Sequence, residues 1–167
     1  MQIDAKNYNP ELHDRWKALT VKQPYANDLI TPAYIIDGMT YSVKSIEVRS
    51  KNTPYRGDIM ICSSANPVVA GLESGVTLGI VELYDVKPIT EFTPEDWRRT
   101  RIPHDKINNI TRGYGWCMRN PRKVIELPIK GQLGIYNLVY TKNIIIEYPR
   151  VMVVDRGSFQ QIENSYE

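Results

Sequence analysis

Four charged residues in two short stretches of the chain could together form a binding site for a polar ligand. Lys22 lies in one stretch, and Lys44, Glu47 and Arg49 lie in the other. Glu47 and Arg49 are two residues apart, so a regular strand places both side chains on the same face. Lysine and arginine bind phosphate or carbonyl groups, and glutamate accepts a hydrogen bond from an exocyclic amine. This combination suits a nucleobase or a nucleotide.

Lys44 is three residues before Glu47, so a regular strand would place its side chain on the face opposite to that of Glu47 and Arg49. It can join them only if it lies in the loop that enters the strand, or in a bulge. If it is desolvated near Arg49, its amine has a lowered pKa and can act as a base or a nucleophile. Glu47 would then transfer protons or orient water. The competing interpretation is a surface ion pair between Glu47 and Arg49, which contributes little to stability.

Three aromatic residues accompany these charges. Tyr25, Tyr55 and Trp116 could each stack on the face of a base, a contact worth roughly 1–3 kcal/mol. Aromatic side chains at such positions are also common in the core or at the rim of a domain. The sequence leaves both possibilities open.

The elements that must position these residues are short strands with a helix between them. Leu19 and Val21 alternate with polar neighbours, which predicts a half-buried strand over residues 17–23. Pro24 ends that strand and can open a short helix over residues 25–30, because its missing N–H costs nothing in a first helical turn.

The rest of the chain predicts more short strands joined by turns. Asp37-Gly38 favours a turn, so residues 31–43 should form a loop or a small hairpin. A helix is expected from Thr93 to about Pro103. Strands are predicted at 45–50, 58–63, 76–86, 114–119, 122–129, 133–140 and 143–147, with a weaker one at 150–154. This order favours an α+β fold, a small mixed β-barrel with short peripheral helices.

The composition is that of one globular domain. The chain has 167 residues, of which 42% are hydrophobic and 24% charged, and this balance excludes a disordered chain. Cys62 and Cys117 are too few for a disulfide framework and indicate a reducing compartment. We expect an N-terminal extension over 1–16, a domain over 17–154 and a C-terminal tail over 155–167.

Signals for membranes, cofactors and metals are missing from the sequence. Residues 1–10 lack the apolar segment of a secretory signal, and no apolar run approaches the ~20 residues that cross a bilayer. We therefore expect a cytoplasmic location. No phosphate-binding or dinucleotide-binding glycine motif occurs, and the histidines and cysteines lack metal-ligand spacing. We expect no cofactor and no metal, although carboxylates could still hold Mg²⁺.

Charge is distributed unevenly along the chain. Residues 94–130 hold nine Lys or Arg and four acids, a net charge of +5, while the remainder has 12 bases and 15 acids, a net charge of −3. A basic segment on an otherwise acidic chain can track phosphates. A solvated, helix-bearing surface explains the same pattern equally well.

A set of short motifs extends from about residue 17 to residue 140. They are Leu19-Thr-Val-Lys-Gln-Pro-Tyr-Ala26, Lys44-Ser-Ile-Glu-Val-Arg49, Thr53-Pro-Tyr-Arg-Gly57, Ile59-Met-Ile-Cys-Ser-Ser64 and Leu78-Gly-Ile-Val-Glu-Leu-Tyr-Asp85, with Gly115-Trp116 and Pro128-Ile-Lys-Gly131 further on. Together they resemble the ASCH family, a branch of the PUA-like small barrels. The hallmark of that family is Gly-x-Lys-x-x-Glu-x-Arg after an apolar-basic-Gln-Pro-aromatic segment. Ser42 stands in place of the family glycine, and residues 31–43 look like an insertion.

The resemblance implies a nucleic-acid or nucleoside connection. ASCH domains are generally taken as RNA-binding modules, so the implied partner is RNA or a nucleoside or nucleotide, with single-stranded DNA as a further possibility. The implied ligand-binding residues are Lys22, Gln23, Tyr25, Arg49, Tyr55, Arg56, Ser63 and Trp116.

The same resemblance implies that the protein could be a small hydrolase. Some bacterial members are amidohydrolases that act on acylated cytidine nucleosides, and others have been assigned ribonuclease activity. The hydrolase members use a lysine and a threonine of the hallmark segment and a glutamate elsewhere. Lys44 matches the lysine, but Glu47 replaces the threonine, and the remaining glutamate has no assigned counterpart. Lys44 and Glu47 are the candidate catalytic residues. A third interpretation, an interaction module with a vestigial cleft, predicts a shallow or blocked pocket around Glu47.

Overall fold

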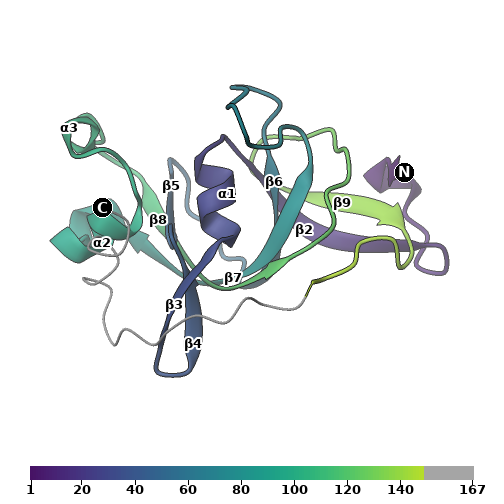
Figure 1. Ribbon diagram of the computed structural model, residues 1–167, viewed down its shortest axis with the longest axis horizontal. Coiled ribbons are helices and arrows are strands. Elements are labelled where there is room, and N and C mark those ends of the chain that lie inside the picture. Colours follow the sequence, from purple (N-terminus) through teal and green to yellow (C-terminus); the bar gives the residue numbers. More distant parts are fainter. Residues whose placement is uncertain (149–167) are drawn as a thin grey trace.

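A computed structural model describes residues 1–148 of the chain (Figure 1). Its main feature is a seven-stranded sheet in the order β1-β9-β2-β6-β7-β8-β5. The strands are β1 (Gln2–Ile3), β2 (His13–Val21), β5 (Ile46–Arg49), β6 (Gly57–Ser63), β7 (Thr77–Pro88), β8 (Tyr114–Lys123) and β9 (Ile135–Thr141). β2 and β6 run parallel, and the other neighbours are antiparallel.

The sheet is open, so the expected closed barrel is wrong, whereas the expected mixture of strands and short helices is confirmed. β1 and β5 are the two edges of the sheet. Figure 1 shows the β1–β9 end on one side of the molecule and β5 with β8 on the other. Both edge strands are very short and expose few unpaired backbone groups, so the sheet does not need closure to protect its edges.

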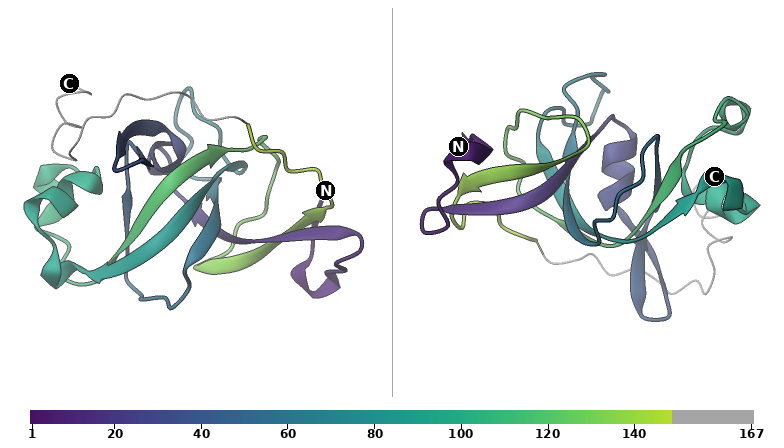
Figure 2. Two further views of the ribbon diagram at one scale, coloured as in Figure 1. Left: turned by 90° about the horizontal axis from the view of Figure 1, so that it is seen from below. Right: turned by 180° about the vertical axis from the view of Figure 1, so that it is seen from behind.

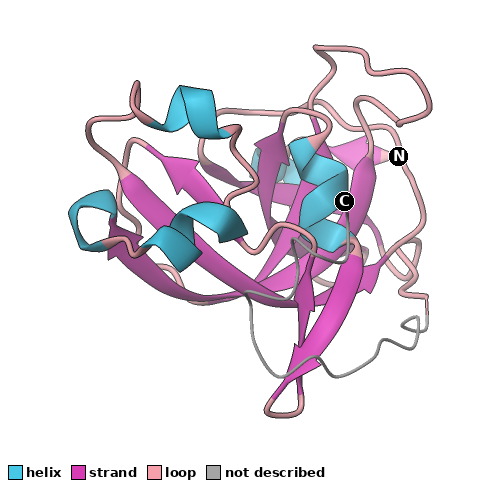
Figure 3. Cartoon of the chain, turned by 60° about the vertical axis from the view of Figure 1, so that its left-hand side comes forward, coloured by secondary structure: helices cyan, strands magenta, loops and turns pink. Residues whose placement is uncertain are grey.

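The remaining elements are short and peripheral. β3 (Pro32–Ile36) and β4 (Met39–Ser42) form the hairpin predicted within residues 31–43, and Figure 3 shows it projecting from the body of the molecule. The helices are α1 (Tyr25–Ile30), α2 (Pro94–Arg99) and α3 (His104–Ile107), with 3-10 turns η1 (Ala5–Asn7) and η2 (Ile89–Glu91). Figure 2 shows α2 and α3 at the end of the molecule far from the N-terminus.

Helix α1 packs on one face of the sheet, over β6, β7 and β8. Its buried residues Ala26, Leu29 and Ile30 join a core cluster with residues of β2, β6, β7 and β8. Gln23 holds the start of the helix, because its side-chain oxygen accepts a hydrogen bond from the Asn27 N–H at 3.0 Å. Gln23 thus ties α1 to the segment that follows β2, and the Asp28 carbonyl oxygen of α1 accepts the Lys44 N–H of the loop before β5. These two segments carry charged residues discussed below.

Strand β6 is buried on both of its faces. Ile59 and Ile61 enter the cluster beneath α1, while Met60 and Cys62 enter a second cluster with residues of β2, β7 and β9. This explains the uninterrupted apolar run of β6, which a strand with one solvated face would not have. Burial raises the pKa of the Cys62 thiol to about 12, so Cys62 is a core residue and not an activated nucleophile.

Several element boundaries differ from those expected. β2 begins at His13 rather than at residue 17, and β1 pairs with β9, so part of the expected N-terminal extension belongs to the sheet. β8 covers the strand expected at 114–119 and only the first two residues of the one expected at 122–129, whose remainder contributes isolated bridges at Val124 and Pro128. Residues 143–147 contribute only the bridge between Val124 and Glu147. α2 is shorter than expected, and α3 was not predicted. The weak strand at 150–154 and the tail at 155–167 lie outside the described residues.

Candidate functional site

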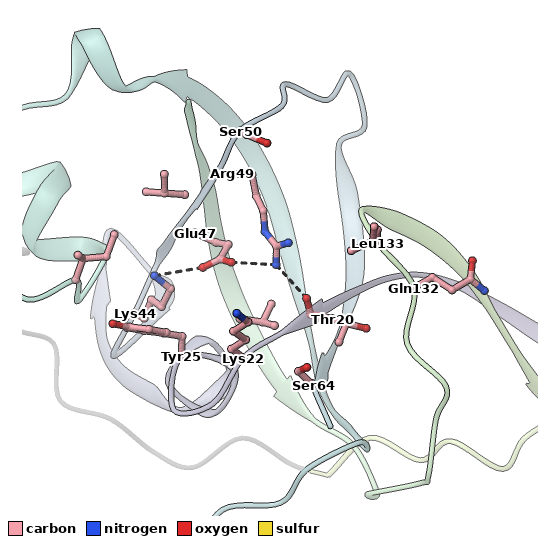
Figure 4. A pocket seen from close by; sticks show the side chains of 13 residues that line it. Thr20, Lys22, Tyr25, Lys44, Glu47, Arg49, Ser50, Ser64, Gln132 and Leu133 are labelled. Atoms are coloured by element: carbon pink, nitrogen blue, oxygen red, sulfur yellow. Dashed lines mark hydrogen bonds and ion pairs between the residues drawn. The ribbon is translucent and has the colours of Figure 1, made fainter. Parts of the chain in front are cut away.

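The four charged residues singled out in the sequence line a single cavity of about 460 Å³ (Figure 4). Lys22 follows β2, Lys44 lies in the loop before β5, and Glu47 and Arg49 lie on β5. The other lining residues are Thr20, Val21, Tyr25, Val48, Ser50, Ser64, Ile102, Gln132 and Leu133. Stretches that are distant in the sequence therefore meet at one hollow.

Local backbone structure explains why Lys44 reaches the same hollow as Glu47. Residues 43–45 are irregular, as the parity argument requires, and the regular strand starts at Ile46. The Lys44 N–H donates to the carbonyl oxygen of Asp28 on α1, and the Ser45 N–H donates to that of Arg99 on α2. The entering loop is thus held between two helices, which directs the Lys44 side chain toward Glu47.

Glu47 bridges two cations. Its Oε1 lies 3.4 Å from Lys44 Nζ, and its Oε2 lies 3.0 Å from Arg49 Nη2. Dashed lines mark both ion pairs in Figure 4. The Lys44 amine also donates to the Thr100 carbonyl oxygen at 2.5 Å and lies 5.0 Å from the centre of the Tyr25 ring, within cation–π range. These contacts compensate the burial of a lysine that is only 1% exposed.

Burial determines the electrostatics of Lys44. Desolvation lowers the pKa of its amine, and this exceeds the opposing effects of the nearby carboxylates of Glu47 and Asp28. Arg49 lowers the pKa further, as the sequence argument anticipated. The site therefore holds an amine that gives up its proton more easily than an ordinary lysine.

A pH-dependent stability is expected from this shift. The pKa of Lys44 is lower in the folded protein than its ordinary value of 10.5, so between these two values the unfolded chain binds the extra proton. The free energy of unfolding of the wild type, minus that of Lys44→Met, should rise as the pH approaches 10.5 from below. Urea unfolding of both proteins across this range measures the difference. A difference that is flat or falls with pH would contradict the assignment.

The single carboxylate of Glu47 cannot neutralise all three cations of the cavity, which are Lys22, Lys44 and Arg49. An Arg49 Nη2 donates to the Thr20 carbonyl oxygen at 3.0 Å, and the buried Arg49 Nε has no hydrogen-bond partner within residues 1–148. Lys22 is exposed, and no carboxylate of the described residues pairs with it. Three cations and one carboxylate leave the cavity with a net charge of +2, which favours an anionic ligand.

Two of the three predicted stacking aromatics do not line the cavity. Trp116 is buried in the core cluster beneath α1, and its Nε1 donates to the Lys51 carbonyl oxygen at 3.1 Å. Tyr55 packs at the margin of that cluster and donates to the Asp58 carbonyl oxygen. Tyr25 alone of the three has a side chain in the cavity wall. An aromatic residue beside a motif carries no sequence signal that separates these outcomes.

The other predicted ligand-binding residues also lie outside this cavity. Gln23 is buried and anchors α1, and its Nε2 donates to the Glu73 carbonyl oxygen at 2.9 Å. Arg56 donates to carbonyl oxygens of its own turn, including that of Thr53 at 2.9 Å. Ser63 lines an adjoining cavity of about 300 Å³, which shares with the first cavity Thr20, Ser64, Gln132 and Leu133.

Sequence reasoning missed the part of the wall that comes from the loop before β9. Gln132 and Leu133 lie in that loop, and the Leu133 side chain is 99% exposed at the cavity. The sequence signal next to this loop is Gly131, the end of the Pro128-Ile-Lys-Gly131 motif; in the structure, a Cβ added there would lie 2.7 Å from Thr20 Oγ1. A glycine at so close an approach marks the point where this loop meets β2.

The family model that matches this chain is that of the ASCH domain, over residues 19–124. This is well over half of the chain. The chain belongs to the ASCH family. The match contains all four charged residues of the cavity, and the recognition made from the motifs is confirmed. No curated protein matches the chain.

Ser42 stands two residues before Lys44, where the resemblance in the sequence led us to expect a glycine. It is buried and ends β4, where it pairs with Pro32. The hairpin of residues 31–43 therefore precedes Lys44 directly in the chain.

Within residues 1–148, no three His, Cys, Asp or Glu side chains gather as metal ligands would. No helix in this part of the chain has the length and apolar character to cross a bilayer.

The basic segment of this ASCH protein is partly neutralised. Arg119 pairs with Glu82 at 2.8 Å and Arg122 with Asp58 at 2.6 Å. Arg99 is buried and donates to Ser45 Oγ at 2.9 Å. These three cations stabilise the fold, so any phosphate track must use other basic residues of the segment.

Proposed function

We propose that this protein binds single-stranded RNA and takes one nucleotide of the strand in the cavity beside Glu47. The observation that carries the proposal is the convergence of Lys22, Lys44, Glu47 and Arg49 on one hollow with a net charge of +2. Its volume of about 460 Å³ lies within the range of small-molecule sites. Membership of the ASCH family supports the same class of ligand.

The chemistry of the wall suits a phosphorylated base. Lys22 and Arg49 offer donors for phosphate or base carbonyl oxygens, and Glu47 offers acceptor capacity for an exocyclic amine. Tyr25 provides an aromatic wall, although Lys44 already lies near its ring. The cavity of about 460 Å³ beside Glu47 supports a binding site over a vestigial cleft.

Removing the charge of Lys22 is expected to weaken RNA binding without disturbing the fold. Lys22 is exposed and has no carboxylate partner among the described residues. Lys22→Gln should lower the affinity for short RNA about tenfold, as expected for one charge-assisted hydrogen bond. It should also reduce the slope of log K against log salt concentration by about one. Fluorescence anisotropy with labelled RNA and DNA oligomers at several salt concentrations measures both quantities.

Lys51→Gln is the matched control for this experiment. Lys51 is an exposed lysine just after β5 whose side chain does not line the cavity. It should change affinity much less than Lys22→Gln. Equal effects of the two variants would indicate diffuse electrostatic attraction in place of a site. Absence of binding to every oligomer at low salt would reject the proposed function.

The buried amine of Lys44 favours a second candidate function, that of a hydrolase. Its lowered pKa and the Glu47 oxygen 3.4 Å away form a base paired with a proton carrier. Hydrolysis of an acylated cytidine nucleoside would add the water oxygen to the acyl carbon and a proton to the leaving exocyclic nitrogen. Turnover of acylated nucleosides and of labelled RNA by the wild type and by Lys44→Met tests this candidate. Equal turnover by both proteins would exclude Lys44 from the mechanism.

A further inference from the structure

A second cavity, of about 610 Å³, adjoins the first at Ile102. It is formed at the α2–α3 end of the molecule, which Figure 2 shows far from the N-terminus. Its lining residues are Phe92, Pro94, Trp97, Arg98, Arg101, Ile102, His104 and Ile107. Ile102 lines both cavities, so the two hollows lie next to each other on the molecule.

The wall of the second cavity combines aromatic rings with basic groups. Phe92 and Trp97 pack edge to face, with ring centres 4.8 Å apart. Arg98, Arg101 and His104 also line the cavity, and no carboxylate residue does. Aromatic rings beside cations are the combination that single-stranded nucleic acids require, because bases stack on the rings and phosphates pair with the cations.

The two arginines that line the second cavity, Arg98 and Arg101, differ in their surroundings. Arg98 is half-buried and has no ion-pair partner within residues 1–148. Arg101 lies near Asp28 on α1. Its charge lowers the pKa of the Asp28 carboxyl, although burial has the larger effect and raises that pKa. A phosphate can therefore bind Arg98 without displacing a carboxylate from it, which makes Arg98 the candidate phosphate-binding residue of this cavity.

The short segment 100–102 connects the two cavities. The Thr100 carbonyl oxygen accepts the Lys44 amine of the first cavity, and Ile102 lies in the wall of both. Arg101 between them has a φ of 58°, in the left-handed region that few non-glycine residues occupy. This turn directs the chain from the first cavity into the second.

We propose that the second cavity binds the neighbouring nucleotide of the RNA strand, with its base against Trp97 and a phosphate at Arg98. The inference rests on the proposed function, because the strand enters through the first cavity. It extends that function from a single nucleotide to a ligand of at least two. The occupant follows from the position of the second cavity next to the first, with Ile102 in both walls, and from Arg98, which has no ion-pair partner among residues 1–148.

The test compares ligands that differ by one nucleotide. Affinities of the full chain for AMP, CMP and UMP are measured against those for the dinucleotides pApA, pCpC and pUpU by isothermal titration at low salt. The best dinucleotide should bind at least about fivefold more tightly than its mononucleotide, the lower limit expected from stacking one base. Arg98→Gln should lower this ratio, because the second phosphate loses its cation, whereas Arg112→Gln should preserve it. Arg112 is an exposed arginine of the same basic segment that lines neither cavity.

A second measurement does not depend on a variant. In protein labelled with 5-fluorotryptophan, the ¹⁹F resonance of Trp97 should shift with the dinucleotide and not with the mononucleotide. Mononucleotide binding without a gain for the dinucleotide, or a gain that is as large in Arg98→Gln as in the wild type, would overturn the second subsite and leave the proposed function standing. Failure of mononucleotides and dinucleotides alike to bind would overturn both.

Discussion

Replacing Glu47 with glutamine is expected to lower the free energy of unfolding by about 3 kcal/mol, the cost of leaving a buried charge without its partner. Glu47 is the carboxylate that joins Lys44 to Arg49, and Lys44 is almost completely buried. Glutamine keeps the size and a hydrogen-bond acceptor but removes the negative charge. Urea unfolding at neutral pH, followed by circular dichroism, measures the loss.

The double variant Lys44→Met/Glu47→Gln is the control for this prediction. Removing the lysine charge as well should recover most of the lost stability, because no buried ammonium then lacks a carboxylate. We expect Arg49 to keep, in every variant, the hydrogen bond that it donates to the Thr20 carbonyl oxygen. Glu47→Gln with wild-type stability, or a double variant no more stable than Glu47→Gln, would mean that the pair is not buried as described.

Substituting Gly115 with alanine is expected to destabilise the protein by about 3 kcal/mol, at the upper end of the usual cost of overpacking. A Cβ at this position of β8 would lie 2.2 Å from Cζ of Phe92 and 2.9 Å from Cγ2 of Ile46. A shift of the Phe92 ring would disturb the segment that leads into α2, and a shift of Ile46 would disturb the edge strand β5. Thermal and urea unfolding of Gly115→Ala measure the effect.

A double-mutant cycle with Phe92→Ala isolates the contact. In the Phe92→Ala background the ring is absent, so Gly115→Ala should cost much less than in the wild type. The two substitutions should therefore be strongly non-additive. Additive costs would show that the ring does not press on Gly115.

Local sequence patterns were sufficient to predict most helices and strands, but not whether the sheet closes into a barrel. The alternation around Leu19 and Val21, the prolines and the Asp37-Gly38 turn correctly indicated β2, α1 and the β3–β4 hairpin. Whether a sheet closes depends on pairing between its edge strands, which no local pattern encodes. β1 has two residues and lies far along the chain from β9, so its pairing with β9 could not be predicted from periodicity.

The candidate site shows the same division. The parity of Glu47 and Arg49, and the exclusion of Lys44 from their strand, were predicted correctly because they follow from the two-residue period of a strand. The place of Trp116 in the core and of Leu133 at the cavity depends on contacts across distant parts of the chain. Such contacts become visible only when the sheet is assembled.

An NMR titration of the isotope-labelled protein with pUpU, pApA and pCpC tests most directly whether the four charged residues form one binding site. We expect the largest shifts at the side-chain signals of Lys22 and Arg49 and at backbone signals of β5, with smaller shifts elsewhere. Signals that stay unchanged at this cavity, while another face of the molecule shifts or none does, would contradict the account.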